Sequence, residues 1–380
     1  MRPRFEVAQL LEDKWEWVFT NPHFSGHQKR TLAALRDCRT RALGGHEEVC
    51  TSCGTIRISY NSCRNRHCPK CQNTQREQWI EARQKELLPI PYFHVVFTIP
   101  GCLNPYCQSH PRILYNTLFK AAWHTLRQFA ADPKHLGAKT GATMVLHTWG
   151  QNLMLHPHVH CIVPGGGLSK NGKWKNARGK GKFLFPVKAM SKVFRAKFVA
   201  LLRKSKLNIS GSCYKQCFRK SWVVYAKRPF LGPRQVIEYL GRYTHKIAIS
   251  NHRIEDLALG QVQFSYKDYK QAGVKRSMTL SDQEFLRRFA LHILPHRFVR
   301  IRHYGLLASR YKAANLSAAA QQLNHSLDGH IADLDWKAAS KNLLGFDPDV
   351  CRHCGGQMII LGFLPPSRAP PKINSILKNV

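Results

Sequence analysis

The sequence predicts an α+β fold, in which an antiparallel or mixed sheet has helices on one of its faces. Between residues 92 and 294, short segments rich in β-branched and aromatic residues are interspersed with longer segments that have an apolar stripe at helical spacing. The first fifth of the chain differs in composition and contains six of the 13 cysteines, which indicates a small module before the sheet.

The N-terminal part combines helices with this cysteine-rich segment. Residues 1 to about 35 are expected to be helical, because apolar residues recur there at helical spacing. A further helix is expected over 73–88, with Asn73 as its N-cap. The two prolines of segment 89–91 end that helix and mark a domain boundary.

The elements after this boundary are expected from the same two patterns. Residues 168–185, rich in glycine and lysine, are expected to form a hairpin or loop. The expected strands cover 92–100, 141–151, 158–166, 221–230, 246–250 and 260–269, and the expected helices cover 110–130, 189–207, 232–245 and 281–294.

The charge balance is far from neutral. Lys and Arg number 59 against 22 Asp and Glu, which leaves a formal net charge of +37. Nucleic acid is the expected partner of such a chain, because basic side chains bind phosphates and release counterions, with a membrane surface as the competing polyanion. There is no run of 18 or more apolar residues and no signal-peptide core, so we expect a cytoplasmic protein.

The cysteine spacing predicts a zinc site. Cys50-x-x-Cys53 and Cys68-x-x-Cys71 are separated by 14 residues, and two such knuckles can place four thiolates around one Zn²⁺. A segment of about 35 residues with few large apolar side chains needs such a metal in order to fold.

Other potential ligands remain beside these four cysteines. They could form a second zinc site, or equally be free thiols and surface histidines; they are Cys38, His46, Cys63 and His67. Near the C-terminus, Cys351-x-x-Cys354 is a further knuckle without an evident second half. Basic neighbours favour contact of this module with DNA, namely Arg57, Arg64, Arg66 and Lys70.

The stretch LHPHVHCIVPGGG, residues 155–167, carries alternating histidines in an expected strand. Side chains alternate between the faces of a strand, so His158 and His160 project to one side, about 7 Å apart. Two imidazoles so placed can bind one divalent ion. Pro157 fixes the entry to the strand, and the three glycines that follow it allow a substrate to approach closely.

A pair of tyrosines forms the second half of this pattern. Tyr239 and Tyr243 stand at i and i+4 on one face of an expected helix. Such a pair usually packs into a core, but Arg242 and His245 flank it and Lys246 follows, which is unusual for a core face. A tyrosine hydroxyl can attack phosphorus and form a covalent intermediate, provided that a cation lies nearby.

Taken in this order, the zinc knuckles, HPHVHCIVPGGG and YLGRYTH resemble the two-tyrosine HUH transposases of bacterial rolling-circle insertion sequences. SCRNRHCPKC resembles their zinc segment, and CRHCGGQM resembles their C-terminal knuckle. The resemblance covers residues 10 to about 365. It implies an HUH nuclease-like fold, in which a central antiparallel sheet carries the metal-binding histidines on a middle strand and the tyrosines lie on a nearby helix.

The resemblance also implies roles for individual residues. Tyr239 and Tyr243 would be the nucleophiles, and His158 and His160 would bind Mg²⁺ or Mn²⁺. Such sites usually need a third protein ligand, and Gln151 is favoured over His147, His94 and His245. The DNA-binding residues expected on this basis are Arg64, Arg66, Lys70, Arg242 and Lys246.

The activity implied by the resemblance is transposition. The protein would cleave and rejoin single-stranded element ends through a 5′-phosphotyrosine intermediate in a rolling-circle-like route. No G-x-x-x-x-G-K-[ST] loop occurs, so host replication or helicase proteins would be partners, and the chain could form an oligomer. The expected location is the cytoplasm of a bacterium, at the nucleoid.

Two other functions stay open. A plasmid replication initiator or relaxase would use the same chemistry. A non-catalytic zinc-finger DNA-binding protein would account for the charge and the cysteines, but it would give the histidine strand and the tyrosine pair no role. The expected domains are a helical and zinc-binding domain over 1–88, an HUH-type catalytic domain over 89–300, and a basic C-terminal region with a knuckle over 301–380.

Overall fold

The structure is a computed structural model, which describes residues 3–178, 184–227, 241, 247–268, 271–326, 337–338, 340–341 and 345–367, with the backbone only at 73–75. Its centre is a five-stranded sheet in the order β12-β4-β5-β3-β8, in which every neighbouring pair is antiparallel. The strands are β3 (Tyr92–Thr98), β4 (Gly141–Trp149), β5 (Leu155–Pro164), β8 (Val224–Ala226) and β12 (Ile301–Gly305). The predicted α+β class and the antiparallel sheet with the histidine strand in its middle are therefore confirmed.

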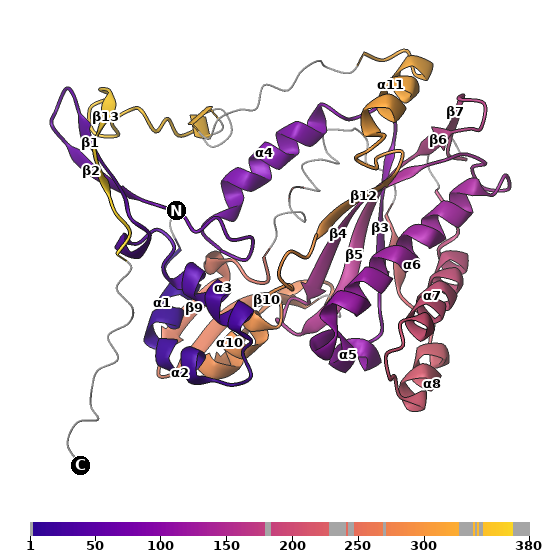
Figure 1. Ribbon diagram of the computed structural model, residues 1–380, viewed down its shortest axis with the longest axis horizontal. Helices are drawn as coiled ribbons and strands as arrows, with labels where there is room; N and C mark the ends of the chain where they lie inside the picture. Colours follow the sequence, from indigo (N-terminus) through magenta and orange to yellow (C-terminus); the bar gives the residue numbers. More distant parts are fainter. Residues whose placement is uncertain are drawn as a thin grey trace.

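One face of this sheet is apolar, because alternate residues of its strands are apolar. Phe97, Leu146 and Val159 point into the main core, where α6 (Pro111–Ala131) and α7 (Val187–Lys204) pack against them. Figure 1 shows these two helices side by side along the sheet. The opposite face of the same strands carries His158 and His160, so the alternation that builds the core also sets the histidines apart from it.

Shorter elements complete this layer. They are η2 (Gly101–Leu103), α5 (Asn104–Ser109), α8 (Gly211–Arg219), and the hairpin of β6 (Gly166–Leu168) and β7 (Trp174–Asn176). This hairpin begins two residues before the segment 168–185 that was predicted to be a hairpin or loop. On the histidine side, α4 (Gln72–Gln84) and α11 (Lys312–Gln322) contribute to a smaller core, which contains Ile162 of β5.

A second large core joins segments that are far apart in the sequence. Leu11 and Leu32 of the N-terminal helices pack with Phe264 and Phe285, which lie more than 200 residues later. This body contains α1 (Val7–Asp13), α2 (Trp15–Thr20), α3 (Gly26–Arg36), η3 (Asn251–Arg253), the sheet β9 (Ile254–Ala258), β10 (Gln261–Asp268) and β11 (Val274–Ser281), and α10 (Asp282–Ala290). Within the described residues, no helix is long and apolar enough to cross a membrane.

A third sheet joins the two ends of the chain. In the order β13-β1-β2, the late strand β13 (Met358–Leu364) pairs with β1 (Gly45–Cys50), which follows η1 (Arg41–Leu43) and pairs with β2 (Ile56–Tyr60). Figure 1 shows this sheet standing apart from the body of the molecule. The hydrophobic cores thus do not follow the expected domain limits: segment 1–88 shares its core with β10 and α10, and residue 301 begins a strand of the central sheet.

Three local expectations need correction. The helix expected over 73–88 with Asn73 as its N-cap is α4, which begins at Gln72 with Cys71 as its N-cap and ends at Gln84. The described part of segment 246–250 is not a strand; Ala248 and Ile249 are buried in the second core as an irregular segment. The histidine strand begins at Leu155 rather than at residue 158.

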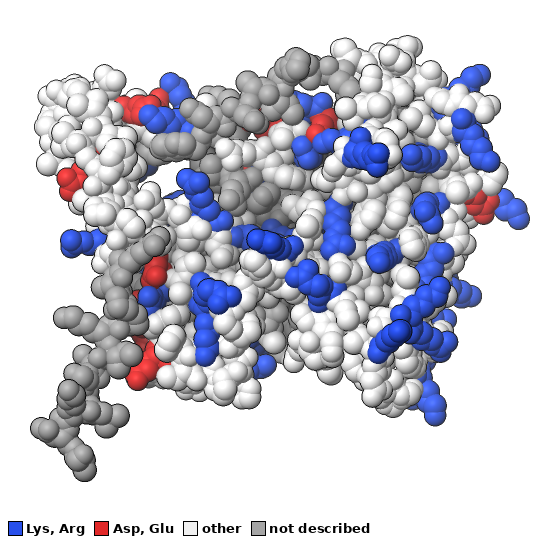
Figure 2. All heavy atoms as spheres, in the orientation of Figure 1, with Lys and Arg blue, Asp and Glu red and all other residues white. Residues whose placement is uncertain are grey.

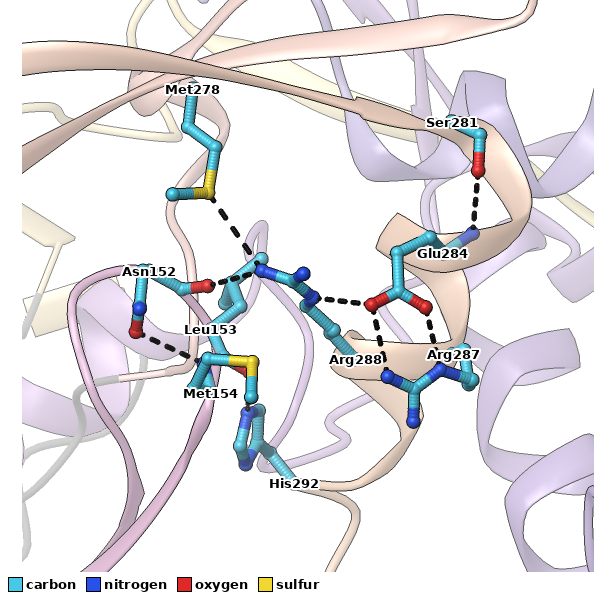
Figure 3. A network of polar contacts seen from close by, with 9 residues as sticks. All are labelled: Asn152, Leu153, Met154, Met278, Ser281, Glu284, Arg287, Arg288 and His292. Carbon is cyan, nitrogen blue, oxygen red and sulfur yellow. Dashed lines mark hydrogen bonds and ion pairs between the residues drawn. The ribbon is translucent and has the colours of Figure 1, made fainter.

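The turn between β4 and β5 is held by charged side chains of α10 (Figure 3). Arg288 reaches across to donate to the carbonyl of Asn152 at 3.2 Å, and it also contacts the sulfur of Met278 at 3.8 Å. Glu284 orients this arginine by accepting from its Nε at 2.7 Å, and Glu284 also binds Arg287 with both oxygens. These charge-assisted bonds fix the turn that leads into the histidine strand.

His292 holds the same turn from the buried side. Its Nε2–H donates to the carbonyl of Leu153 at 3.0 Å, and its Nδ1 accepts from the hydroxyl of Thr148 at 3.1 Å. Leu153 has a φ of 61°, an unusual conformation for a non-glycine residue that such contacts must maintain. Burial of His292 lowers its pKa to about 4, so the ring is neutral at pH 7.

We predict that His292 makes stability depend on pH. Because the pKa of the folded state lies below the ordinary 6.5, the stabilisation is complete above pH 6.5 and is lost as the pH falls toward 4. Relative to His292→Gln, the wild type should lose about 1–2 kcal/mol of unfolding free energy between pH 7 and pH 5. Denaturant unfolding of both proteins at each pH measures this loss, and a constant difference between them would contradict the prediction.

Candidate functional site

Three histidines converge on the face of the sheet opposite the main core. The register of β4 and β5 places His147 directly opposite His158, and His160 follows two residues later on the same face. The Nε2 atoms of His158 and His160 are 3.1 Å apart. One ring nitrogen from each of the three histidines lies within 4.8 Å of those of the other two.

The contacts of the other ring nitrogens bear on the tautomers of His158 and His160. Nδ1 of His158 lies 2.6 Å from the carbonyl of His156, which can only accept, so Nδ1 carries the proton and Nε2 of His158 is unprotonated. Nδ1 of His160 lies 2.8 Å from Nε2 of His94, and burial lowers the pKa of His94 to about 4, so that ring is neutral at pH 7. A neutral imidazole can donate or accept at that atom, and the tautomer of His160 that donates from Nδ1 presents an unprotonated Nε2 to the shared space.

These donors fit a divalent ion. Two ligands about 2.1 Å from one ion and at right angles to each other are about 3.0 Å apart, close to the separation of the Nε2 atoms of His158 and His160. The second ring nitrogen of each is hydrogen-bonded, as is usual for metal-binding imidazoles. Three nitrogen donors suit Mn²⁺ better than Mg²⁺, which prefers oxygen.

The structure brings His147 to this pair, whereas the sequence favoured Gln151 as the third ligand. Gln151 lies in the turn after β4, where its backbone carbonyl accepts from Nη2 of Arg253 at 2.5 Å. His147 stacks on Trp149, with ring centroids 4.6 Å apart and planes 19° apart. The residues of the tyrosine motif, which are Tyr239, Arg242, Tyr243, His245 and Lys246, lie outside the described residues.

A first group of four cysteines lies within the second core. Two of its Sγ–Sγ distances, from Cys71 to Cys38 and from Cys71 to Cys63, are 3.4 and 3.7 Å. Tetrahedral Zn²⁺ with sulfur ligands requires about 3.8 Å. Hydrogen bonds from neighbouring thiols lower the pKa of Cys38 to about 7, which favours the thiolate. The group consists of Cys38, Cys63, Cys68 and Cys71.

A second group of four joins the N-terminal and C-terminal knuckles. Cys50 lies 3.4 Å from Cys354, and Cys53 lies 3.9 Å from Cys351, each measured between Sγ atoms. The hydroxyl of Thr55, 3.1 Å from the sulfur of Cys53, lowers the pKa of that thiol to about 5. The pairing of strands β1 and β13 brings these knuckles together.

The predicted set of Cys50, Cys53, Cys68 and Cys71 is therefore wrong, because its two knuckles belong to different groups. The alternative set of Cys38, His46, Cys63 and His67 is also not brought together. His46 pairs with Glu48 at 3.3 Å, and the buried His67 accepts from the backbone N–H of Leu294 at 3.3 Å.

The basic residues near the first cysteine group have different surroundings. Arg66 donates to the carbonyls of Phe298 and, at 3.3 Å, Pro295, which docks the cysteine segment onto the region before β12. Lys70 pairs with Glu6 at 2.7 Å. Arg64 is exposed.

The structure also shows a cysteine group that sequence reasoning missed. Cys213 and Cys217 stand at i and i+4 on α8, and Cys102 of η2 lies against them, with 3.8 Å between the sulfurs of Cys102 and Cys217. The i, i+4 spacing was the available signal, but Cys102 is more than 100 residues away in the sequence. None of the 13 cysteines, all of which are described, forms a disulfide.

Comparison with known proteins adds to this geometry. A family described as "Putative transposase" matches residues 141–315, and one described as "Transposase zinc-binding domain" matches residues 10–99. The "Putative transposase y4qJ" of Sinorhizobium fredii is 44% identical over 388 residues, with 97% of each chain covered. The "Transposase for insertion sequence element IS801" of Pseudomonas savastanoi pv. phaseolicola is 29% identical over 351 residues, covering 87% of this chain and 82% of the relative. No solved structure matches.

These relatives define the class of protein as a transposase, an enzyme that acts on DNA. Within that class, the chain belongs to the Y2 transposase family of insertion sequences, with a zinc-binding domain of the IS91 type. The predicted family and the predicted structural zinc domain are confirmed.

Zinc content tests the assignment of cysteines to groups. We predict that Cys351→Ser and Cys63→Ser each lower the zinc content by one ion per chain, because each removes a ligand of a different four-thiol group. Pairing Cys351→Ser with Cys50→Ser should cause no further loss, whereas pairing it with Cys63→Ser should. Elemental analysis of the purified variants gives the stoichiometry.

The control is Cys161→Ala, which removes a buried thiol of β5 outside both groups and should leave the zinc content unchanged. If Cys351→Ser kept its full zinc content, the prediction would be wrong, and the set of Cys50, Cys53, Cys68 and Cys71 would again be the favoured ligands.

Proposed function

We propose that this transposase cleaves and rejoins single-stranded DNA through a 5′-phosphotyrosine intermediate, and so mobilises an insertion sequence by a rolling-circle-like route. The observation that carries the proposal is the histidine trio, in which the Nε2 atoms of His158 and His160 lie 3.1 Å apart. The names of the relatives favour transposition over plasmid replication, which could use the same chemistry.

His147, His158 and His160 would bind the catalytic ion, Mn²⁺ or Mg²⁺. When bound, such an ion supplies Lewis-acid polarisation of a scissile phosphate. His94 would position rather than ligate, because its Nε2 holds Nδ1 of His160 at 2.8 Å and so directs the other nitrogen of that ring outward. Among the described residues no carboxylate joins this group, which suits an anionic DNA substrate.

Tyr239 and Tyr243 would be the nucleophiles. Gly241, midway between them, has helical backbone and is buried against Ile80 of α4, with no room for a Cβ. Ile80 in turn packs on the core that contains Ile162, which lies on the histidine face of β5. This chain of contacts brings Gly241 to the histidine side of the sheet, which supports the proposed role of the tyrosines that flank it in the sequence.

The chemistry conserves the energy of the phosphodiester bond. The tyrosine oxygen attacks phosphorus, the bond from phosphorus to the 3′ oxygen breaks, and the proton from the tyrosine ends on that oxygen as a 3′-OH. In rejoining, a 3′-OH attacks the phosphotyrosine and the tyrosine hydroxyl is regenerated. No nucleotide hydrolysis is needed, so we propose that a host helicase or replication protein supplies the single strand.

Removal of both nucleophiles is the direct test. We predict that Tyr239→Phe combined with Tyr243→Phe abolishes cleavage while leaving DNA affinity within about twofold, because only the attacking oxygens are removed. The measurement is a denaturing gel of labelled single-stranded element ends with Mn²⁺, in which wild type forms a protease-sensitive 5′ adduct. Nicking by the double variant would overturn the mechanism and leave a zinc-bearing DNA-binding protein as the alternative.

The third ligand can be tested by metal binding as well as by activity. We predict that His147→Ala weakens Mn²⁺ binding more than tenfold and abolishes cleavage, because it removes one of three donors. Gln151→Ala is the matched comparison and should retain both properties. Electron paramagnetic resonance of free Mn²⁺ in a titration measures the affinity. If Gln151→Ala lost Mn²⁺ affinity and His147→Ala did not, Gln151 would be the third ligand and the prediction would be wrong.

A further inference from the structure

A hollow of about 540 Å³ lies at the end of the central sheet away from the histidines. The last turn of α6, the β6–β7 hairpin and the connection from β12 to α11 meet there (Figure 1). Its walls are mostly apolar, and cationic side chains stand at its rim. The residues that matter here are Trp123, Ala131 and Leu306 in the walls and Arg127, Lys139 and Lys170 at the rim.

A second hollow of about 620 Å³ adjoins the first. The two share Ala131, Gly137, Ser169 and Lys170, and the lining of the second also includes Lys173 and Lys175 of the β6–β7 hairpin. Together they form a continuous groove, which we call the hairpin groove, that leads from an apolar recess to a row of lysines.

The surroundings of the hairpin groove are almost without acidic residues. Between Glu86 and Glu238 the sequence contains a single one, Asp132, whose carboxylate accepts from the backbone N–H of Lys134 at 2.8 Å. Figure 2 shows lysine and arginine side chains spread over the half of the molecule that holds α6 and α7, with little red among them. The field at the groove is therefore strongly positive and attracts a polyanion.

One wall of the recess is formed by an aromatic side chain. Trp123 stacks on Tyr304 of β12, with ring centroids 5.3 Å apart and planes 18° apart, so its indole is fixed. A volume of about 540 Å³ holds one nucleotide with room to spare, within the range of small-ligand pockets of about 300–1,000 Å³. An apolar recess beside an aromatic side chain suits an unstacked base, and the lysines outside it suit phosphates.

We propose that the hairpin groove binds an unpaired nucleotide of a single-stranded DNA segment, with the base in the recess and the flanking phosphates on Lys139, Lys170 and the hairpin lysines. The inference deepens the proposed function, since it assumes a single-stranded substrate. The groove lies beyond the far end of β5 from the histidine trio, so the protein would hold the strand at two separate places.

The test separates shape from charge. Ala131→Phe fills the wall shared by both hollows without changing charge, and Ala131 is an exposed residue at the end of α6, where a larger side chain is tolerated. We expect about tenfold weaker binding of a labelled single-stranded oligonucleotide, measured by fluorescence anisotropy without added divalent ions, and little change for a blunt duplex. Ala200→Phe, at an exposed position of α7, is the matched control and should bind like wild type.

A charge variant supplies an independent signature. Lys139→Gln with Lys170→Gln should reduce the slope of log affinity against log salt by about 1.4, because each lost phosphate contact on a single strand contributes about 0.7. Ala131→Phe should leave that slope unchanged. The exposed pair Lys188→Gln with Lys192→Gln on α7 removes the same charge outside the groove and should affect strand binding less.

The possible outcomes distinguish a failure of the groove proposal from a failure of the proposed function. Equal strand affinity of Ala131→Phe and Ala200→Phe would overturn the inference while leaving the tyrosine chemistry untouched, since no cleavage occurs under these conditions. A free deoxynucleoside monophosphate that binds wild type but not Ala131→Phe, without competing for the strand, would assign the recess to small nucleotides and overturn it as well. Nicking by the tyrosine double variant would instead overturn the proposed function and leave the groove in place.

Discussion

The register between β4 and β5 is the constraint on which the rest of the site depends. Because the side chains of a strand alternate strictly, a slip of one residue would turn His158 and His160 into the main core and bring Val159 to the histidine face. The cost of burying imidazoles against α6 and α7 excludes that slip. The apolar face of the sheet therefore specifies the metal face, and the core that stabilises the protein also aligns His147 with its partners.

Contacts from distant parts of the chain reinforce this register. Arg288 and His292 hold the turn between the two strands, and Arg66 anchors the cysteine segment to the region that precedes β12. The first cysteine group lies in the second core, which also contains Leu153 of this turn and apolar residues of α10. The first zinc site and the turn that leads into the histidine strand are thus packed in the same core, although the two sites share no ligand.

The sequence was informative wherever the signal was local. Alternation in β5 predicted that His158 and His160 share a face, and the same patterns located α6, α7 and most strands of the sheet. It included His147 among the candidates for the third ligand but favoured Gln151, because the position of His147 depends on the pairing of two strands rather than on its own neighbours. The prediction of the zinc ligands failed for a similar reason. The spacing of Cys50, Cys53, Cys68 and Cys71 is typical of one zinc site, but in the folded chain each knuckle lies beside two cysteines from another part of the sequence.

The second cysteine group has a consequence for the order of events during synthesis. Two of its ligands are made early, whereas Cys351 and Cys354 are made about 300 residues later. The strand β13, which completes the sheet around these knuckles, is made later still. This sheet is therefore completed only after the intervening catalytic region has been translated. A chain that stops before residue 351 retains Cys50 and Cys53 without their partners, so closure of this sheet distinguishes chains that extend through β13 from shorter ones.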